Sequence, residues 1–168
     1  ADIEEVIGLV NAAIESTRVL ATGLSPANAE RGGLVAALET LAARLQDRHG
    51  VDVAVTTRFD APFTLADAAL NHLYRIAQEA VLNAIRHGNP RHVGIELALS
   101  DGHIRLRIVD DGRGLGTAAP ASAGLGRRIM RYRAQMLGGT CEVGAAGARG
   151  VCVECVCPVA PNLRAAAS

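Results

Sequence analysis

The sequence predicts an α/β (α+β) two-layer sandwich, in which helices pack on one face of a mixed β-sheet and one further helix precedes the domain. Five segments alternate apolar and other residues with the period of a strand, whereas four segments repeat apolar residues at helical spacing. Asp101-Gly102 lies between two of the strand segments and is a hairpin signal. Together these patterns favour a sheet covered by helices over an all-helical or all-β protein.

The composition suits one compact domain that binds its ligands locally. The 168 residues are 49% hydrophobic and 20% charged, as in ordinary soluble domains. Because 17 basic residues balance 17 acidic ones, long-range charge suggests neither nucleic acid nor an anionic membrane surface as a direct partner. The sequence shows no apolar run of about 18 residues and no basic-then-apolar leader, so we expect a cytoplasmic setting for this stretch.

The first expected element is a helix over residues 2–22. Its apolar residues recur at alternating four- and three-residue steps, which is typical of a helix that packs against another helix. They are Ile3, Ile7, Val10, Ile14, Thr17 and Ala21. An amphipathic helix lying on its own domain is the alternative. Gly23-Leu24-Ser25-Pro26 ends the pattern, so we expect one domain over residues 25–158 and a frayed tail over 159–168.

Within the domain, the expected elements follow in a regular order. A helix with leucines at positions 34, 38, 41 and 45 ends near His49-Gly50. Residues 112–126 are rich in small residues and predict a mobile loop. The remaining expected helices cover 67–87 and about 127–137, and the expected strands cover 51–59, 93–99, 104–109, 140–144 and 151–157.

Cys141, Cys152, Cys155 and Cys157 raise the question of a metal or redox site. Strand alternation sends Cys152 to one face and Cys155 and Cys157 to the other, whereas zinc needs four ligands in a tetrahedron. We therefore interpret these thiols as buried strand residues.

The helix over 67–87 predicts one apolar face and one face for ligands. Leu70, Leu73, Ala77, Val81 and Ala84 form the apolar side, which we expect to pack on the sheet. Glu79, Asn83 and His87 recur every four residues on the other side, together with His72, Arg75 and Arg86. A carboxylate, an amide and cations on one stripe suit Mg²⁺ together with phosphates. An ordinary solvated helix face is the alternative.

Two glycine-containing segments follow. Asp110-Asp111-Gly112-Arg113-Gly114 comes directly after a strand, where a carboxylate can accept a hydrogen bond from an exocyclic amine. Gly124-Leu125-Gly126 precedes the helix expected near Arg127, where free backbone N–H groups can meet an anion. An acidic turn and a flexible helix entry are the alternatives. Neither segment fits a Walker loop or a Rossmann fingerprint.

Taken in this order, the three features resemble the ATP-binding boxes of sensor histidine kinases, within the wider group that includes DNA gyrase, the Hsp90 chaperones and the MutL proteins. Residues 72–87 look like the N box of the nitrate-sensor-like subfamily. Residues 109–115 look like its first glycine box, and residues 124–126, 130–134 and 137–139 like its second glycine box and the following helix. The resemblance extends over about residues 20–158 and implies the same two-layer fold.

The resemblance implies roles for these residues, with ATP and Mg²⁺ as the cofactors. Asn83 would coordinate Mg²⁺, and Glu79 would act as general base or align the metal and its water. Arg86 and His87 would approach the triphosphate, and Asp110 would accept the adenine amino group. Glycines would shape the nucleotide pocket and its lid: Gly112, Gly114, Gly124 and Gly126.

Two positions depart from the pattern of the family. Gly126-Arg127 stands where Gly-Leu is often found, and Gly150-Val151 stands where Gly-Thr is common. The first changes a position that would belong to the lid, and the second removes a hydroxyl near the pocket floor.

The resemblance implies a histidine protein kinase that transfers the ATP γ-phosphoryl group to a histidine on a dimerisation domain. Residues 1–24 contain no histidine, so we interpret them as the C-terminal part of a dimerisation helix. A response regulator would act downstream, and the full-length protein would be a homodimer, either membrane-attached or soluble. A serine kinase of the anti-sigma-factor type and a non-catalytic nucleotide-binding adaptor are the alternatives.

Overall fold

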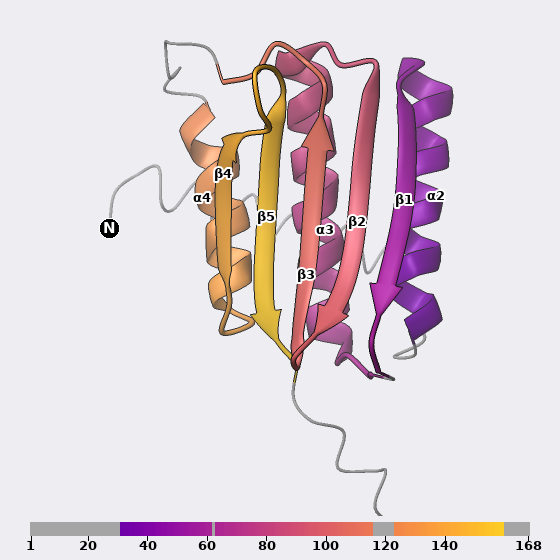
Figure 1. Cartoon of the computed structure of the whole chain (residues 1–168), viewed down its shortest axis with the longest axis vertical. Helices are drawn as coiled ribbons and strands as arrows, with labels where there is room; N and C mark the ends of the chain where they lie inside the picture. Colours follow the sequence, from indigo (N-terminus) through magenta and orange to yellow (C-terminus); the bar gives the residue numbers. More distant parts are fainter. Residues whose placement is uncertain (1–30, 62, 116–122, 160–168) are drawn as a thin grey trace, which may run out of the picture.

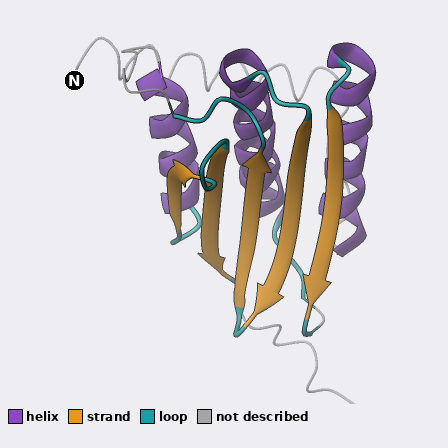
Figure 2. Ribbon diagram, turned by 45° about the horizontal axis from the view of Figure 1, so that its top comes forward, coloured by secondary structure: helices purple, strands orange, loops and turns teal. Residues whose placement is uncertain are grey.

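The computed structural model describes residues 31–61, 63–115 and 123–159, and these residues confirm the predicted two-layer sandwich. Five strands form one sheet in the order β1-β2-β3-β5-β4. Figure 1 shows α2, α3 and α4 together behind one face of this sheet, and Figure 2 shows the same layers from a tilted view. The helix expected over 2–22, the boundary at 23–26 and most of the expected tail lie outside the described residues.

The sheet is mixed, as predicted. Its strands are β1 (Asp52–Phe59), β2 (His92–Ser100), β3 (His103–Asp110), β4 (Thr140–Ala145) and β5 (Val151–Pro158). β1 pairs with β2 in parallel, while the other three pairings are antiparallel. Asp101 (φ 51°) and Gly102 (φ 71°) make the tight turn from β2 to β3, which needs a positive φ at both positions. The last residue of β3, Asp110, therefore lies beside the first residues of β2 and β5.

The helix predicted over residues 67–87 is found at that position, but its last turn is π-helical. α3 (Asp67–Asn83) is an α-helix, and η1 (Ala84–Gly88) continues it as a π-helical turn, whereas we expected α-helix over the whole range 67–87. Asn89 then leaves the helix with a left-handed φ of 49° before Pro90, which has no N–H to continue a helix.

The prediction for the last helix was wrong at both ends. α4 (Ala123–Gln135) begins about one turn earlier than expected, so Gly124 and Gly126 lie in its first turn and not in a loop before it. Glycine costs about 1 kcal/mol in a helix interior, but packing overrides this weak preference. Met130 and Ala134 are fully buried, and Gly126 lets α4 approach α3 closely.

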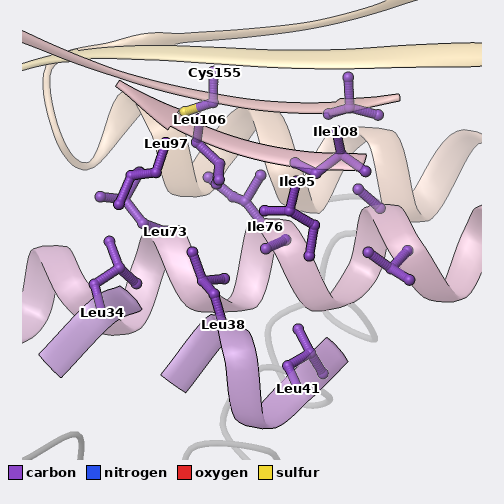
Figure 3. Packing of buried hydrophobic residues seen from close by; sticks show 14 of the residues in the cluster. Leu34, Leu38, Leu41, Leu73, Ile76, Ile95, Leu97, Leu106, Ile108 and Cys155 are labelled. Atoms are coloured by element: carbon purple, nitrogen blue, oxygen red, sulfur yellow. The ribbon is translucent and has the colours of Figure 1, made fainter. Parts of the chain in front are cut away.

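The core fills the space between the helices and one face of the sheet (Figure 3). α2 (Arg31–His49) supplies Leu34, Leu38 and Leu41, and the predicted apolar side of α3 is buried, with Leu73 and Ala77 inaccessible to solvent. Alternate residues of β2 and β3 are buried and pack against these helices, because successive side chains of a strand point to opposite faces of the sheet. Within the described residues, none of the helices is long and apolar enough to cross a membrane.

The cysteines follow the predicted alternation of β5. Cys155 and Cys157 face the core and are buried, whereas Cys152 lies on the other face and is partly exposed. Burial raises the pKa of the Cys141 thiol to about 11. The buried thiols therefore pack as small apolar side chains.

Candidate functional site

A pocket of about 550 Å³ lies between α3, α4 and the helix-covered face of the sheet. This volume is in the range of about 300–1,000 Å³ that is usual for small-molecule and cofactor sites. The pocket gathers most of the predicted site residues: Glu79, Asn83, Arg86, His87, Asp110, Gly114 and Gly126. Gly112 and Gly124 do not line it. Residues separated by almost 50 positions in the sequence thus share one cavity, because β3 and α4 both pack beside α3.

Asp110 lies at one end of the pocket, where β3 stops. Its side chain is buried, and both carboxylate oxygens accept backbone hydrogen bonds: Oδ1 from the Gly112 N–H at 2.8 Å and Oδ2 from the Val151 N–H at 3.3 Å. Burial raises the pKa of Asp110 above its ordinary value, and these two hydrogen bonds oppose that shift. A carboxylate can accept about four hydrogen bonds, so Asp110 can also accept one from an exocyclic amine.

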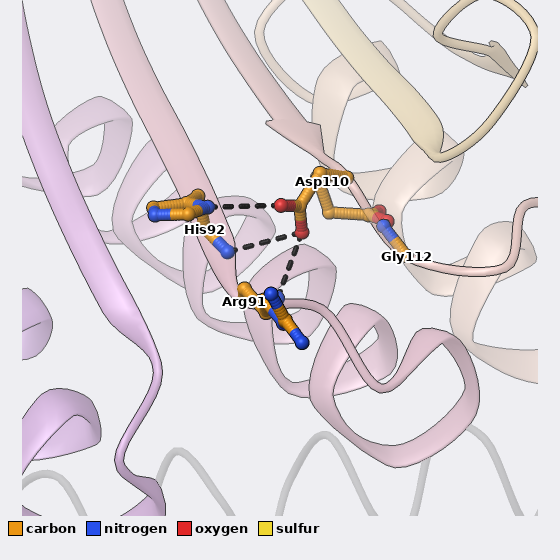
Figure 4. A network of polar contacts seen from close by, with 5 residues as sticks. Arg91, His92, Asp110 and Gly112 are labelled. Atoms are coloured by element: carbon orange, nitrogen blue, oxygen red, sulfur yellow. Dashed lines mark hydrogen bonds and ion pairs between the residues drawn. The ribbon is translucent and has the colours of Figure 1, made fainter.

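Asp111, beside it, fixes the turn that carries Asp110. Its Oδ1 accepts hydrogen bonds from the N–H groups of Arg91 (2.8 Å) and His92 (3.0 Å), and its Oδ2 lies 2.9 Å from Nδ1 of His92. Figure 4 shows these contacts around Arg91 and His92, next to Asp110 and Gly112. Hydrogen bonds from His92 hold the pKa of Asp111 well below its ordinary value. Asp111 does not line the pocket, so it is a positioning residue.

Glu79 and Asn83 lie near the other end. Asn83 Nδ2 donates a hydrogen bond of 3.0 Å to Glu79 Oε1, which confirms that the two side chains share one line along α3. Gly126 of α4 faces this pair, because a Cβ added there would overlap Glu79 Oε1 and lie 3.1 Å from Asn83 Nδ2. The first turn of α4 therefore lies directly against this pair of side chains.

Two residues of the predicted ligand stripe lie elsewhere. His72 is outside the pocket and lies between α3 and α4, with its Nδ1 3.5 Å from Nη1 of Arg133. Burial, and then the charge of Arg133, lower the pKa of His72. Arg75, also outside the pocket, donates to Gln78 Oε1 at 2.8 Å. The stripe was predicted about two turns too long, because α4 packs against its N-terminal part at His72.

The apolar wall of the pocket was not predicted from the sequence. Ile108, Met130, Val143, Val151 and Val153 line it from three elements of the sheet and from α4. Strand alternation places Ile108 and Val153 on the helix-covered face, but alternation alone does not show where the core gives way to a cavity.

Residues 68–161 match the family described as histidine kinase-, DNA gyrase B-, and HSP90-like ATPase. This chain belongs to that family. The match covers the helix with Glu79 and Asn83, the turn after β3, and α4. It therefore includes all the predicted site residues.

The similar curated proteins include sensor histidine kinases. The chain is 28% identical to LiaS of Bacillus subtilis over 145 residues, which are 86% of this chain and 39% of LiaS. It is 33% identical to MctS of Rhizobium johnstonii over 137 residues, 78% of this chain and 29% of MctS. The chain thus spans less than half the length of these relatives, and it corresponds to the ATP-binding domain of a histidine kinase. The nitrate-sensor-like subfamily stays a prediction.

Solved structures share the fold. The ATP-binding domain of PrrB from Mycobacterium tuberculosis has a TM-score of 0.60 at 20% identity, covering 76% of this chain and 94% of that one. The two alternatives, an anti-sigma-factor type of serine kinase and a non-catalytic adaptor, are not favoured, since the matched relatives are sensor histidine kinases.

Proposed function

We propose that this chain binds ATP with Mg²⁺ and presents its γ-phosphoryl group to a histidine on the dimerisation domain of a sensor histidine kinase. The observation that carries the proposal is the pocket itself, which has a buried carboxylate acceptor at one end and the Glu79–Asn83 pair at the other. Its apolar wall suits the faces of a purine ring. The names of LiaS and MctS as sensor histidine kinases and of the PrrB domain as ATP-binding support it.

Each end of the pocket has a separate role. Asp110 would accept a hydrogen bond from the adenine amino group, and its backbone partners at Gly112 and Val151 hold its carboxylate in place for this. Arg86 and His87 line the pocket and would meet phosphate oxygens, which cations bind through strong hydrogen bonds. Gly114, in the turn after β3, also lines the pocket.

The residues at the Glu79 end fit a magnesium ion. Glu79 and Asn83 bring one carboxylate and one amide to the same spot, and Mg²⁺ prefers a few hard oxygen ligands while it keeps several waters. When bound, the ion would neutralise part of the triphosphate charge. Glu79 would also accept the proton of the attacking imidazole or align water at the site.

The transfer needs a partner domain. An imidazole nitrogen would attack the γ-phosphorus, a nitrogen–phosphorus bond would form as the bond to the β–γ bridging oxygen breaks, and ADP would leave. Positioning and charge stabilisation supply most of the catalysis in such transfers. Residues 1–24 would belong to the dimerisation helix. A homodimeric, cytoplasmically placed kinase domain and a downstream response regulator complete the proposal.

Calorimetric titration with a non-hydrolysable ATP analogue, with and without Mg²⁺, tests the site assignment. Asn83→Ala should remove the gain in affinity that Mg²⁺ gives, whereas Asp110→Ala should weaken binding roughly 10-fold or more in both conditions. Thermal denaturation of each variant checks that it is folded. An equal loss of metal-free binding in both variants would contradict the two separate roles.

A phosphorylation experiment with two chains tests the reaction. This chain is mixed with radiolabelled ATP and with a longer kinase whose own nucleotide site has been disabled but whose dimerisation histidine is intact. Acid-labile label should appear on the longer chain only. Comparable label on this chain alone, lost in His87→Gln, would show that an internal histidine is the acceptor.

A further inference from the structure

We propose that Arg127 is a further phosphate-binding residue, which contacts the terminal phosphate of the nucleotide and makes the pocket prefer ATP to ADP. The inference rests on the proposed function, because it requires that the pocket binds an adenine nucleotide.

Arg127 lies beside the Glu79–Asn83 end of the pocket. It lines the pocket, it is partly buried, and it follows Gly126 in the first turn of α4. Gly126 in turn is packed directly against Glu79 and Asn83. The backbone of Arg127 is therefore held one residue away from the group that would carry the metal.

The Glu79–Asn83 end of the pocket lies away from the Asp110 end, where the adenine would bind. Gly88, the last residue of η1, lies next to Asp110, since a Cβ added at Gly88 would lie 3.4 Å from Asp110 Oδ1. Glu79 precedes Gly88 by nine positions, which is about 13 Å along the helical axis at the usual rise per residue. With the adenine at Asp110, the phosphate furthest from the base points toward Glu79, Asn83 and Arg127.

The other cations of the pocket lie closer to the base. Arg86 and His87 directly precede Gly88 in η1, so their backbone lies nearer to Asp110 than the backbone of Glu79 does. They would meet the inner phosphates. Arg127 is thus the pocket-lining cation placed at the outer end of a bound triphosphate.

The charge of Arg127 is available for such a contact. In the part of the chain that the structure describes, Arg127 takes part in no ion pair, whereas Arg105 and Arg107 of the sheet pair with Glu154 and Glu96. A guanidinium presents two parallel N–H groups to a phosphate, and it stays charged at any pH of interest. The free N–H groups at the start of a helix add partial positive charge at the same place. A leucine could supply neither.

Titration of the folded chain with ADP and with a non-hydrolysable ATP analogue, both in Mg²⁺, tests the inference. Arg127→Leu should weaken binding of the ATP analogue about 10-fold and that of ADP less than about threefold, since only the triphosphate has the terminal group. The matched control is Arg128→Leu, which removes the same charge from an exposed neighbour that does not line the pocket. It should stay within about threefold of the unchanged chain for both ligands.

The outcomes separate the two proposals. If the unchanged chain binds both nucleotides but Arg127→Leu binds the ATP analogue equally well, or loses ATP analogue and ADP alike, the role of Arg127 is wrong and the proposed function stands. An equal loss in Arg128→Leu would also overturn it, because the effect would then come from net charge. If the unchanged chain binds neither nucleotide, the proposed function fails and the Arg127 assignment fails with it.

Discussion

Gly150→Ala offers a sharp test of how the structure holds Asp110. Gly150 immediately precedes β5 and has a φ of +80°, in the left-handed region. A Cβ added there would overlap the carbonyl oxygen of Asp110 and lie 2.8 Å from its carbonyl carbon. The Gly150 N–H also donates to the carbonyl oxygen of Gly112 at 2.9 Å. Alanine therefore cannot fit unless the start of β5 moves away from the end of β3.

The cost of this substitution has two parts. A left-handed conformation costs an alanine about 1–2 kcal/mol relative to glycine. Displacement of the strand would also break two hydrogen bonds, from Gly150 to Gly112 and from Val151 to Asp110, each of which contributes about 1 kcal/mol. We expect Gly150→Ala to lower the free energy of unfolding by about 3–4 kcal/mol.

Gly50→Ala is the matched control. Gly50 has a similar φ of +66° but no atom within 4 Å of an added Cβ, and it lies between α2 and β1, away from the pocket. Gly50→Ala should lower the free energy of unfolding only by the cost of the left-handed conformation, about 1–2 kcal/mol. Urea denaturation measures both variants, and titration with an ATP analogue should show weaker binding for Gly150→Ala only. Equal losses of stability in the two variants would refute the argument that the start of β5 packs too closely against the backbone of Asp110 to admit a side chain at Gly150.

Three other predictions concern the core, the acidic turn and the thiols. Leu73→Ala should lower the free energy of unfolding by about 2–5 kcal/mol in urea denaturation, because Leu73 is fully buried in the core. Hydrogen bonds lower the pKa of Asp111 in the folded chain. Ionised Asp111 therefore adds fully to the free energy of unfolding above the pKa that it has in the unfolded chain, and this contribution is lost as the pH falls from there toward the folded pKa. Between about pH 5 and pH 3, the unchanged chain should therefore lose stability relative to Asp111→Asn, and parallel pH profiles would contradict this. An alkylating reagent should modify the partly exposed Cys152 before Cys141, whose pKa burial raises to about 11, and mass spectrometry of the labelled peptides checks the order.

The layers of the fold could be predicted because local patterns agree with the packing. Strand alternation placed Ile95, Leu97, Leu106 and Ile108 on one face, and all four are buried under the helices. The helical spacing of α3 likewise separated its buried side from Glu79 and Asn83. Wherever only one face of a helix or strand is covered, the spacing of apolar residues in the sequence matches the spacing of buried residues in the structure.

The sequence could not place α4 correctly. Gly124 and Gly126 suggested a loop because glycine is a poor helix former. In the structure, Gly126 lies within α4 and against Glu79 and Asn83, residues that are more than 40 positions away in the sequence. A preference of about 1 kcal/mol cannot decide such a position when contacts with another helix determine it.

Different kinds of contact hold each end of the pocket in place, so substitutions at the two ends should have different effects. At the Asp110 end, short backbone hydrogen bonds join the turns: Arg113 N–H to the Gly88 carbonyl at 2.9 Å, and Gly150 N–H to the Gly112 carbonyl at 2.9 Å. At the Glu79 end, the contacts belong to the side chains of Glu79 and Asn83 and to the first turn of α4. Backbone contacts are part of the fold, so under the proposed function substitutions at the Asp110 end should change stability and nucleotide binding together. Arg127→Leu should change binding alone, because its guanidinium supports no other described residue through an ion pair.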